Sequence, residues 1–150
     1  MTPMTLDQAI EQFLPAGMKG MKLDHCLTLE IYDRDQCYLT PEGFPEGIVF
    51  GRDYGSVYIA FFDGSGVHSV EPEKKRYFIN SSVALFLTFL EIFFVLGLKW
   101  TVEQEAENRE YTVEKHLAEM AAAFSRLDPR AMVGETYWTA VIEVTADMCG

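Results

Sequence analysis

The chain has 150 residues, of which 49% are apolar, and it carries a net charge of −11 at neutral pH. The apolar share is typical of a folded domain and argues against a disordered chain, and this length favours one domain with a sizeable core. The acidity disfavours direct nucleic-acid binding, because phosphate groups are repelled. It suits a basic macromolecular partner, although acidity also serves solubility alone.

The cysteines and the first residues predict a cytoplasmic protein. Cys26, Cys37 and Cys149 are too few and too irregularly spaced for a disulfide framework, which indicates reduced thiols. The start of the chain, MTPMTLDQAIEQFL, has neither the basic residues nor the long apolar run of a signal peptide.

The first half of the chain predicts one helix followed by several strands. Thr5 to Leu14 fits a short helix, because its apolar residues share one face and Thr5 can cap it. Cys26 to Tyr32 alternates well enough for a strand, and Thr40 to Gly47 is rich in turn residues. Ser56 to Phe62 and Val67 to Val70 flank the sequence DGSG. That pattern predicts a β-hairpin, since glycine supplies the positive φ of a tight turn.

The segment from Val83 to Leu98 has only two polar side chains, Thr88 and Glu91. As a helix it would be about 24 Å long, which is shorter than the ~30 Å hydrocarbon core of a membrane. A carboxyl group in its middle would be costly in lipid. We therefore expect a mostly buried helix of a soluble domain and no membrane contact.

Further signals mark the ends and one face of this helix. Cap residues precede it, and Gly97 is a plausible end. One less apolar stripe, expected to be half-exposed, follows the spacing i, i+4, i+7, i+11 and contains Ala84, Thr88, Glu91 and Val95. The alternative is a membrane anchor, which the basic KKR before the segment and Trp100 after it would favour.

The last third of the chain predicts two more helices. Apolar residues spaced by four, three, four and three indicate one buried helix face, formed by Val113, Leu117, Met120, Phe124 and Leu127. Asp128-Pro129 then predicts a short turn with proline at the first helical position. Residues 135–146 fit either a helix or a strand, and the lack of an internal turn signal favours the helix. The order of elements predicts an α+β fold.

The sequence offers no recognisable catalytic, metal or cofactor site. His25, His68 and His116 are scattered, and no paired zinc motif is present. His25-Cys26 with Cys37 could form a metal site or a Cys-His dyad, but the sequence supplies no third partner. There is no nucleophile elbow and no phosphate-binding glycine loop. We expect a protein that is not an enzyme and holds no cofactor.

Acidic residues concentrate in one stretch of 24 residues, where only Arg34 and Arg52 oppose them. Loops on a rigid sheet are where binding groups gather, and an acidic set can cover a basic site on a partner. The candidate partner-binding residues are Glu30, Asp33, Asp35, Glu42, Glu46 and Asp53. A second acidic group, between Glu103 and Glu119, is interpreted as a solvated helix face.

The central block, GRDYGSVYIAFFDGSGVHSVEPEKKRYFINSSVALFLTFLEIF, resembles the SUKH superfamily of SMI1/KNR4-like proteins. The nearest branch is the SUKH-4 immunity proteins of bacterial polymorphic toxin systems. The resemblance rests on a glycine-containing strand, a hairpin turn that opens with Asp63, and an Asn-Ser-Ser entry to an aromatic helix at Asn80. LDPRAM, Trp138 and the final glycine also fit, whereas FLPAGM departs from the Gly-Leu-Pro often found there.

The resemblance implies one SUKH-like domain over residues 1–150, an α+β fold with a central, mostly antiparallel sheet flanked by helices. It implies a non-enzymatic immunity protein that binds a cognate toxin, often a nuclease or deaminase. Such a toxin domain is expected to be basic, and physical occlusion would suffice to inhibit it. A scaffold or regulatory domain with a non-toxin partner is the main alternative. An enzyme that uses His25 or Cys37, and a membrane-anchored protein, remain further alternatives.

Overall fold

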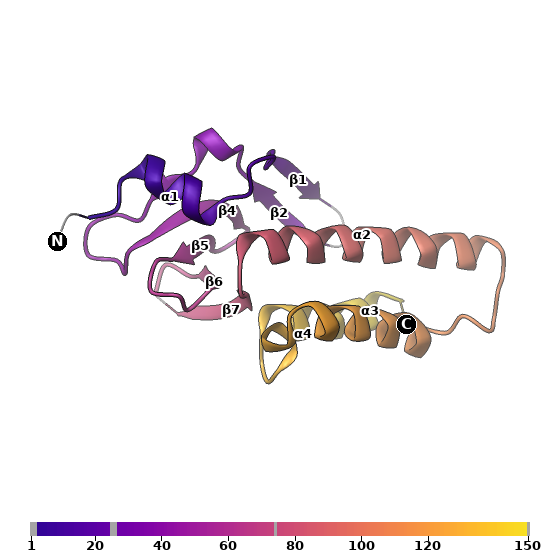
Figure 1. Ribbon diagram of the computed structural model, residues 1–150. Coiled ribbons are helices and arrows are strands. Elements are labelled where there is room, and N and C mark those ends of the chain that lie inside the picture. The colour runs from indigo at the N-terminus through magenta and orange to yellow at the C-terminus, as the bar shows by residue number, and fades with distance from the viewer. Residues whose placement is uncertain (1–2, 25–26, 74, 150) are drawn as a thin grey trace. The chain divides into compact units, whose positions relative to one another are not determined.

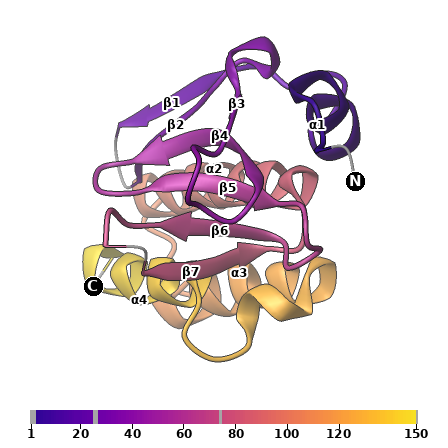
Figure 2. The same cartoon turned by 90° about the vertical axis from the view of Figure 1, so that its left-hand side faces the viewer.

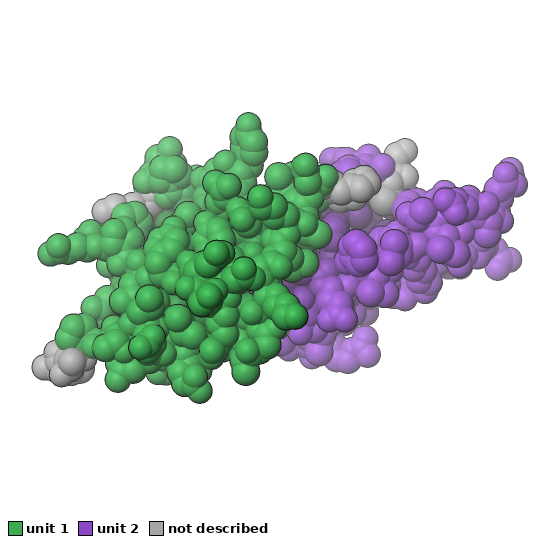
Figure 3. Space-filling model, turned by 90° about the horizontal axis from the view of Figure 1, so that it is seen from above, with its two compact units in different colours: residues 1–84 green, residues 85–150 purple. Residues whose placement is uncertain are grey.

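A computed structural model describes residues 3–24, 27–73 and 75–149. The chain divides into two compact units, Met1–Ala84 and Leu85–Gly150, which Figure 3 shows in different colours. The boundary falls in the first turn of the long apolar helix. A single domain over residues 1–150 stays a prediction.

Unit 1 holds a seven-stranded antiparallel sheet (Figure 2). The strands follow the order β1-β2-β4-β5-β6-β7, and β3 also pairs with β4. Their bounds are β1 (Met21–Asp24), β2 (Thr28–Ile31), β3 (Tyr38–Leu39), β4 (Gly47–Asp53), β5 (Val57–Phe61), β6 (Val67–Val70) and β7 (Arg76–Asn80). This open sheet, together with the helices, confirms the predicted α+β class.

The centre of the sheet is nearly continuous in apolar side chains. The first five residues of β4 are buried, as are the last four of β5. Val49, Ile59, Phe61 and Val70 form one core cluster. Gly51 is required by close packing, because a Cβ there would lie 2.6 Å from the backbone oxygen of Glu30. The predicted hairpin is confirmed, with β5 and β6 paired in register around the Asp63–Gly66 turn.

Helix α1 (Leu6–Phe13) contacts β4 in unit 1. Thr5 is its N-cap, as predicted: Thr5 Oγ1 accepts a hydrogen bond from the backbone N–H of Gln8, and Gln8 Oε1 accepts one from the N–H of Thr5 at 2.9 Å. This capping box satisfies two otherwise free donors of the first turn. It therefore fixes the residue at which α1 begins.

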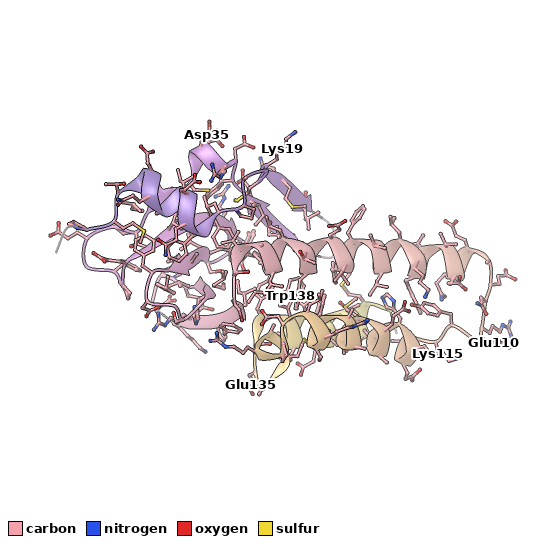
Figure 4. All side chains as sticks on the ribbon, viewed as in Figure 1. Lys19, Asp35, Glu110, Lys115, Glu135 and Trp138 are labelled. Atoms are coloured by element: carbon pink, nitrogen blue, oxygen red, sulfur yellow. The ribbon has the colours of Figure 1, made fainter. Side chains whose placement is uncertain are left out.

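Unit 2 is helical. Helix α2 (Val83–Glu105) is followed by α3 (Val113–Leu127), the 3₁₀ turn η2 (Pro129–Met132) and α4 (Tyr137–Cys149). Trp138 points from α4 toward α2 and is fully buried (Figure 4). Its ring lies 5.5 Å from that of Phe89 on α2 and 4.9 Å from that of Phe124 on α3, centroid to centroid. The proline turn and the final helix are confirmed.

The length of α2 corrects two sequence expectations. The helix does not end at Gly97 but continues to Glu105 (Figure 1), because one internal glycine costs only about 1 kcal/mol. Its 23 residues span about 35 Å, so the argument that it is too short for a membrane is wrong. It is also less buried than expected, with 28% of its most apolar window inside the protein.

Length and composition alone would therefore allow α2 to cross a membrane. A single helix of this kind is weak evidence, since core helices of soluble proteins meet the same criterion. The predicted stripe of α2 is confirmed as its outer face, and all four of its residues, Ala84, Thr88, Glu91 and Val95, are exposed.

Candidate partner-binding surface

The six predicted acidic residues of unit 1 do not all line the same groove. Glu30 and Asp33 line a small groove beside β1 and β2, whereas Glu46 lines a different groove beside α1. Asp35 lies in the 3₁₀ turn η1 (Arg34–Gln36) and projects away from the ribbon (Figure 4). Glu42 is exposed in the loop before β4, and Asp53 is the last residue of β4, where the turn to β5 begins.

The charge of Glu30 is balanced by its neighbours across the sheet. In the register of the three strands, Glu30 stands between Lys22 of β1 and Arg52 of β4. Arg52 Nε donates to Glu30 Oε1 at 3.2 Å. A row with one carboxylate between two cations offers little negative charge to a partner, so Glu30 is a weak candidate.

Asp33 has an internal structural role. Its Oδ1 accepts a hydrogen bond from the backbone N–H of Gly20 at 2.7 Å, which ties the segment before β1 to the turn after β2. A carboxylate that accepts a backbone N–H forms a charge-assisted bond.

Asp53 organises the turn between β4 and β5. Its Oδ1 accepts from the N–H of Gly55 at 3.1 Å, and from the N–H and Oγ of Ser56 at 2.9 and 2.6 Å. Its Oδ2 accepts from the hydroxyl of Tyr58 at 3.4 Å. These bonds engage both carboxylate oxygens, one with the turn and the other with Tyr58 of β5, so the residue presented to solvent is its neighbour Tyr54, which is 96% exposed. The Asp-x-Gly-Ser sequence of this turn could have indicated that role.

A groove with three carboxylates lies along α1, and we call it the acidic groove. Its lining residues are Pro3, Met4, Asp7, Gln8, Glu11, Gln12, Glu46 and Phe62. None of these is a lysine or arginine. Phe62 stacks on Phe13 of α1 at 5.1 Å between ring centroids, which gives the groove a fixed apolar wall.

Sequence reasoning found Glu46 but missed Asp7 and Glu11. These two are four residues apart and therefore share one helix face, a signal that could have been found. Arg34 approaches Glu11, with Nη2 3.5 Å from Oε2, but the Glu11 side chain is 85% exposed. An ion pair that is so open to solvent neutralises little of the charge presented to a partner.

The described residues show no catalytic arrangement around Cys37. Its thiol is buried and donates to the backbone oxygen of Asp33 at 3.4 Å. Burial, with smaller contributions from Asp35 and Asp33, raises the pKa of Cys37 to about 11, which disfavours the reactive thiolate. His25 and Cys26 lie outside the described residues. Within the described chain, no three His, Cys, Asp or Glu side chains come together as metal ligands.

A polar and aromatic cluster in unit 2 joins α2 to α3. His116 is buried, its ring centroid lies 5.1 Å from that of Trp100, and the hydroxyl of Tyr111 lies 3.3 Å from its Nδ1. Burial is the main cause that lowers the pKa of His116. Tyr111 also donates to Glu119 Oε2 at 3.0 Å, and its pKa is raised to about 12, chiefly by burial. We interpret this cluster as a packing element.

Negative charge is shared by both units. Residues 1–84 hold 12 acidic and 7 basic side chains, and residues 85–150 hold 11 acidic and 5 basic ones. Net charge alone therefore does not select unit 1 as the binding unit. In unit 1, a concave site brings Asp7, Glu11 and Glu46 together.

Comparison with known proteins assigns the family. No curated protein and no solved structure matches the chain. The model of the SUKH-4 immunity protein family matches residues 21–144, most of the 150-residue chain. The match covers all seven strands and begins after FLPAGM, where the resemblance also weakens. The chain therefore belongs to the SUKH-4 immunity protein family, which gives it a role in toxin immunity through binding of a cognate toxin.

Proposed function

We propose that this protein neutralises a toxin with a basic catalytic domain, a nuclease or deaminase, by covering its active site. The chain acts as a cytoplasmic binding protein and performs no chemistry on the toxin. The acidic groove carries the proposal, because it is a concave surface in which carboxylates meet an apolar wall.

The lining of the acidic groove suits a lysine or arginine side chain of the partner. The aliphatic stem of such a residue can lie on Met4 and Phe62, while its cationic end reaches Asp7, Glu11 or Glu46. Nucleases and deaminases need cationic side chains to hold nucleic acid. A protein that pairs with those side chains would exclude the substrate.

Among the six acidic residues, we propose that the ones without an internal role contact the toxin. Glu46 belongs to the acidic groove, and Asp35 and Glu42 are exposed on neighbouring connections of unit 1. Glu30, Asp33 and Asp53 shape the surface instead, through the bonds to Arg52, Gly20 and Ser56.

The test measures association of the full chain with its toxin, identified by capture from the source organism and by loss of toxin activity in the complex. The double variant Asp7→Lys with Glu46→Lys is expected to lower the association rate about tenfold at low salt. The matched control is Glu135→Lys with Glu143→Lys, which makes the same charge change on exposed residues of unit 2. High salt should reduce the difference between the two.

Equal association rates for both double variants would remove the acidic groove from the proposal. If the captured partner were a protein without toxic activity, the neutralisation mechanism would be wrong, and the chain would act as a scaffold or regulatory domain.

A further inference from the structure

Helix α2 carries two apolar stripes on opposite sides. The inner stripe holds Phe86, Phe89, Phe93 and Trp100, whose rings pack against Tyr137 and Trp138 of α4 and against Phe124, Tyr111 and His116. These contacts bury the inner apolar face of the helix. The outer apolar stripe takes no part in them.

The outer stripe is apolar over more than two turns. Phe94, Val95, Leu98 and Val102 are 56%, 53%, 53% and 61% exposed. Val95, Leu98 and Val102 are spaced by three and four residues, as in the seam of a coiled coil. A contiguous row of large exposed apolar side chains marks an interaction surface more often than scattered single ones do. We call these four residues the outer apolar face.

The charges around the outer apolar face favour a cationic partner. Glu91 and Glu105 are exposed on the same stripe, seven residues before and seven after Leu98, about 10 Å away on each side. The nearby Lys99 is bound to Glu119 of α3, with Nζ 2.9 Å from both carboxylate oxygens. The flanks of the face are therefore acidic.

This charge pattern argues against a second copy of the chain. An antiparallel pair of α2 helices centred on Leu98 would place Glu91 of one copy opposite Glu105 of the other, and a parallel pair would place each glutamate opposite itself. Like charges in such positions destabilise a helix pair. The same flanks disfavour an anionic lipid surface, which binds helices with lysine and arginine next to the apolar face.

We propose that the outer apolar face binds an amphipathic helix of the cognate toxin. That helix has an apolar stripe, with lysine or arginine about one heptad on either side of its centre, so that each cation meets Glu91 or Glu105. That the partner is the toxin rests on the proposed function. The apolar stripe and the flanking cations expected of the partner helix are inferred from α2 alone. Apolar burial supplies affinity, and the charged flanks set the register.

The experiment uses the full chain and two synthetic helical peptides labelled with fluorescein. Both carry the same central leucine stripe. One has lysine seven residues before and after the centre, and the other has glutamate at those positions. Binding is followed by fluorescence anisotropy for the wild type, Leu98→Asp and Val102→Asp. Val144→Asp is the matched control, because Val144 is a 52% exposed apolar residue on another helix. Circular dichroism confirms that each variant is folded.

The proposal expects saturable binding of the lysine peptide and binding of the glutamate peptide that is at least about tenfold weaker. Leu98→Asp and Val102→Asp should each weaken the lysine peptide about tenfold or more, and Val144→Asp should not. Equal binding of both peptides, no saturable binding, or equal binding to Leu98→Asp would overturn it.

A second copy of the chain and a membrane surface, the two other possible occupants of this face, would each give a different experimental result. A dimer seen by sedimentation that dissociates in Leu98→Asp would identify a second copy. Binding to phosphatidylglycerol vesicles that is lost in Leu98→Asp would identify a membrane. Either result would overturn the proposal. The peptide measurement needs no toxin, so it tests the outer apolar face alone. The proposed role of the acidic groove is tested separately, by the rate of association with the toxin.

Discussion

Lys99 of α2 and Glu119 of α3 form a two-pronged ion pair, in which the Lys99 ammonium lies 2.9 Å from both carboxylate oxygens. The same ammonium lies 4.9 Å from the ring centroid of Tyr111, whose hydroxyl donates to Glu119. One cation, one carboxylate and one ring therefore join the two helices at the end of unit 2 away from Trp138.

Replacing Lys99 with methionine is expected to lower the free energy of unfolding by only about 0.5–1 kcal/mol. The two side chains are 44% and 41% exposed, so solvent screens much of their attraction. Urea unfolding at neutral pH measures the change, and Lys115→Met, which removes an exposed lysine from α3, is the control. If Lys99→Met lowered the free energy of unfolding by no more than Lys115→Met does, the ion pair between Lys99 and Glu119 would contribute nothing to stability.

The stabilisation from Glu119 should depend on pH. The hydrogen bond from Lys99 is the main cause that lowers the pKa of Glu119 below its ordinary value of 4.5. A carboxyl with a lowered pKa in the folded state stabilises the protein above its unfolded pKa, and this contribution is lost as pH falls through the folded pKa. The difference in unfolding free energy between wild type and Lys99→Met should therefore be constant near neutral pH and shrink below pH 4.5. If the difference in unfolding free energy stayed constant at low pH, the stabilisation by Lys99 would not come from its pairing with ionised Glu119.

Trp138 is expected to be the most sensitive position in unit 2. It is fully buried, and its ring contacts two other helices, α2 through Phe86, Phe89 and Phe93, and α3 through Phe124. Trp138→Ala removes these contacts and leaves a cavity, which costs about 3–5 kcal/mol. Val133→Ala, at a 74% exposed position, should change stability by less than about 0.5 kcal/mol. Chemical unfolding of both variants tests this, and a cost below about 1 kcal/mol for Trp138→Ala would mean that the cluster repacks.

Local signals in the sequence predicted most of the elements. The Thr5 cap, the DGSG hairpin and the proline after Asp128 each act within a few residues, and each is confirmed. Strand β1 was missed because Met21–Asp24 is short and its ladder partner β2 gives it order that its own residues do not signal. The end of α2 was misplaced because Gly97 weakens a helix without ending it.

The surface was harder to predict than the elements. Six acidic residues within 24 positions suggested one patch, but strand pairing places Glu30 beside two cations and the turn uses Asp53 internally. Asp7 and Glu46 are far apart in the sequence, and they line one groove only because α1 lies on β4. Tertiary packing therefore determines which acidic side chains lie close together, and the periodicity of the sequence does not contain that information.

Two glycines should respond in opposite directions to alanine. A Cβ at Gly97 of α2 would have no heavy atom within 4 Å, so Gly97→Ala should raise stability by about 0.5–1 kcal/mol through helix propensity. A Cβ at Gly51 would lie 2.6 Å from the backbone oxygen of Glu30. Gly51→Ala must separate β2 from β4 and should cost at least about 1–3 kcal/mol. Thermal unfolding measures the midpoint of each variant relative to the wild type. If both midpoints shifted in the same direction, the explanation given for one of the two glycines would be wrong.

Asp53→Ala separates a structural role from a binding role. The substitution removes the acceptor for Gly55, Ser56 and Tyr58, and we expect it to lower the free energy of unfolding by about 1–3 kcal/mol. Asp35→Ala, which removes an exposed carboxylate of unit 1, is the matched control and should leave stability within about 0.5 kcal/mol.

Tyr54→Ala completes the comparison at the same turn. Tyr54 is 96% exposed, so its removal should leave the unfolding midpoint unchanged. Aromatic side chains on rigid turns are strong anchors in protein interfaces, and we expect this variant to weaken toxin binding. Isothermal calorimetry with the toxin and urea unfolding without it measure the two effects separately. If Asp53→Ala kept its stability and lost toxin binding while Tyr54→Ala lost neither, Asp53 itself would be the contact, and the hydrogen bonds of the turn would be incidental to its role.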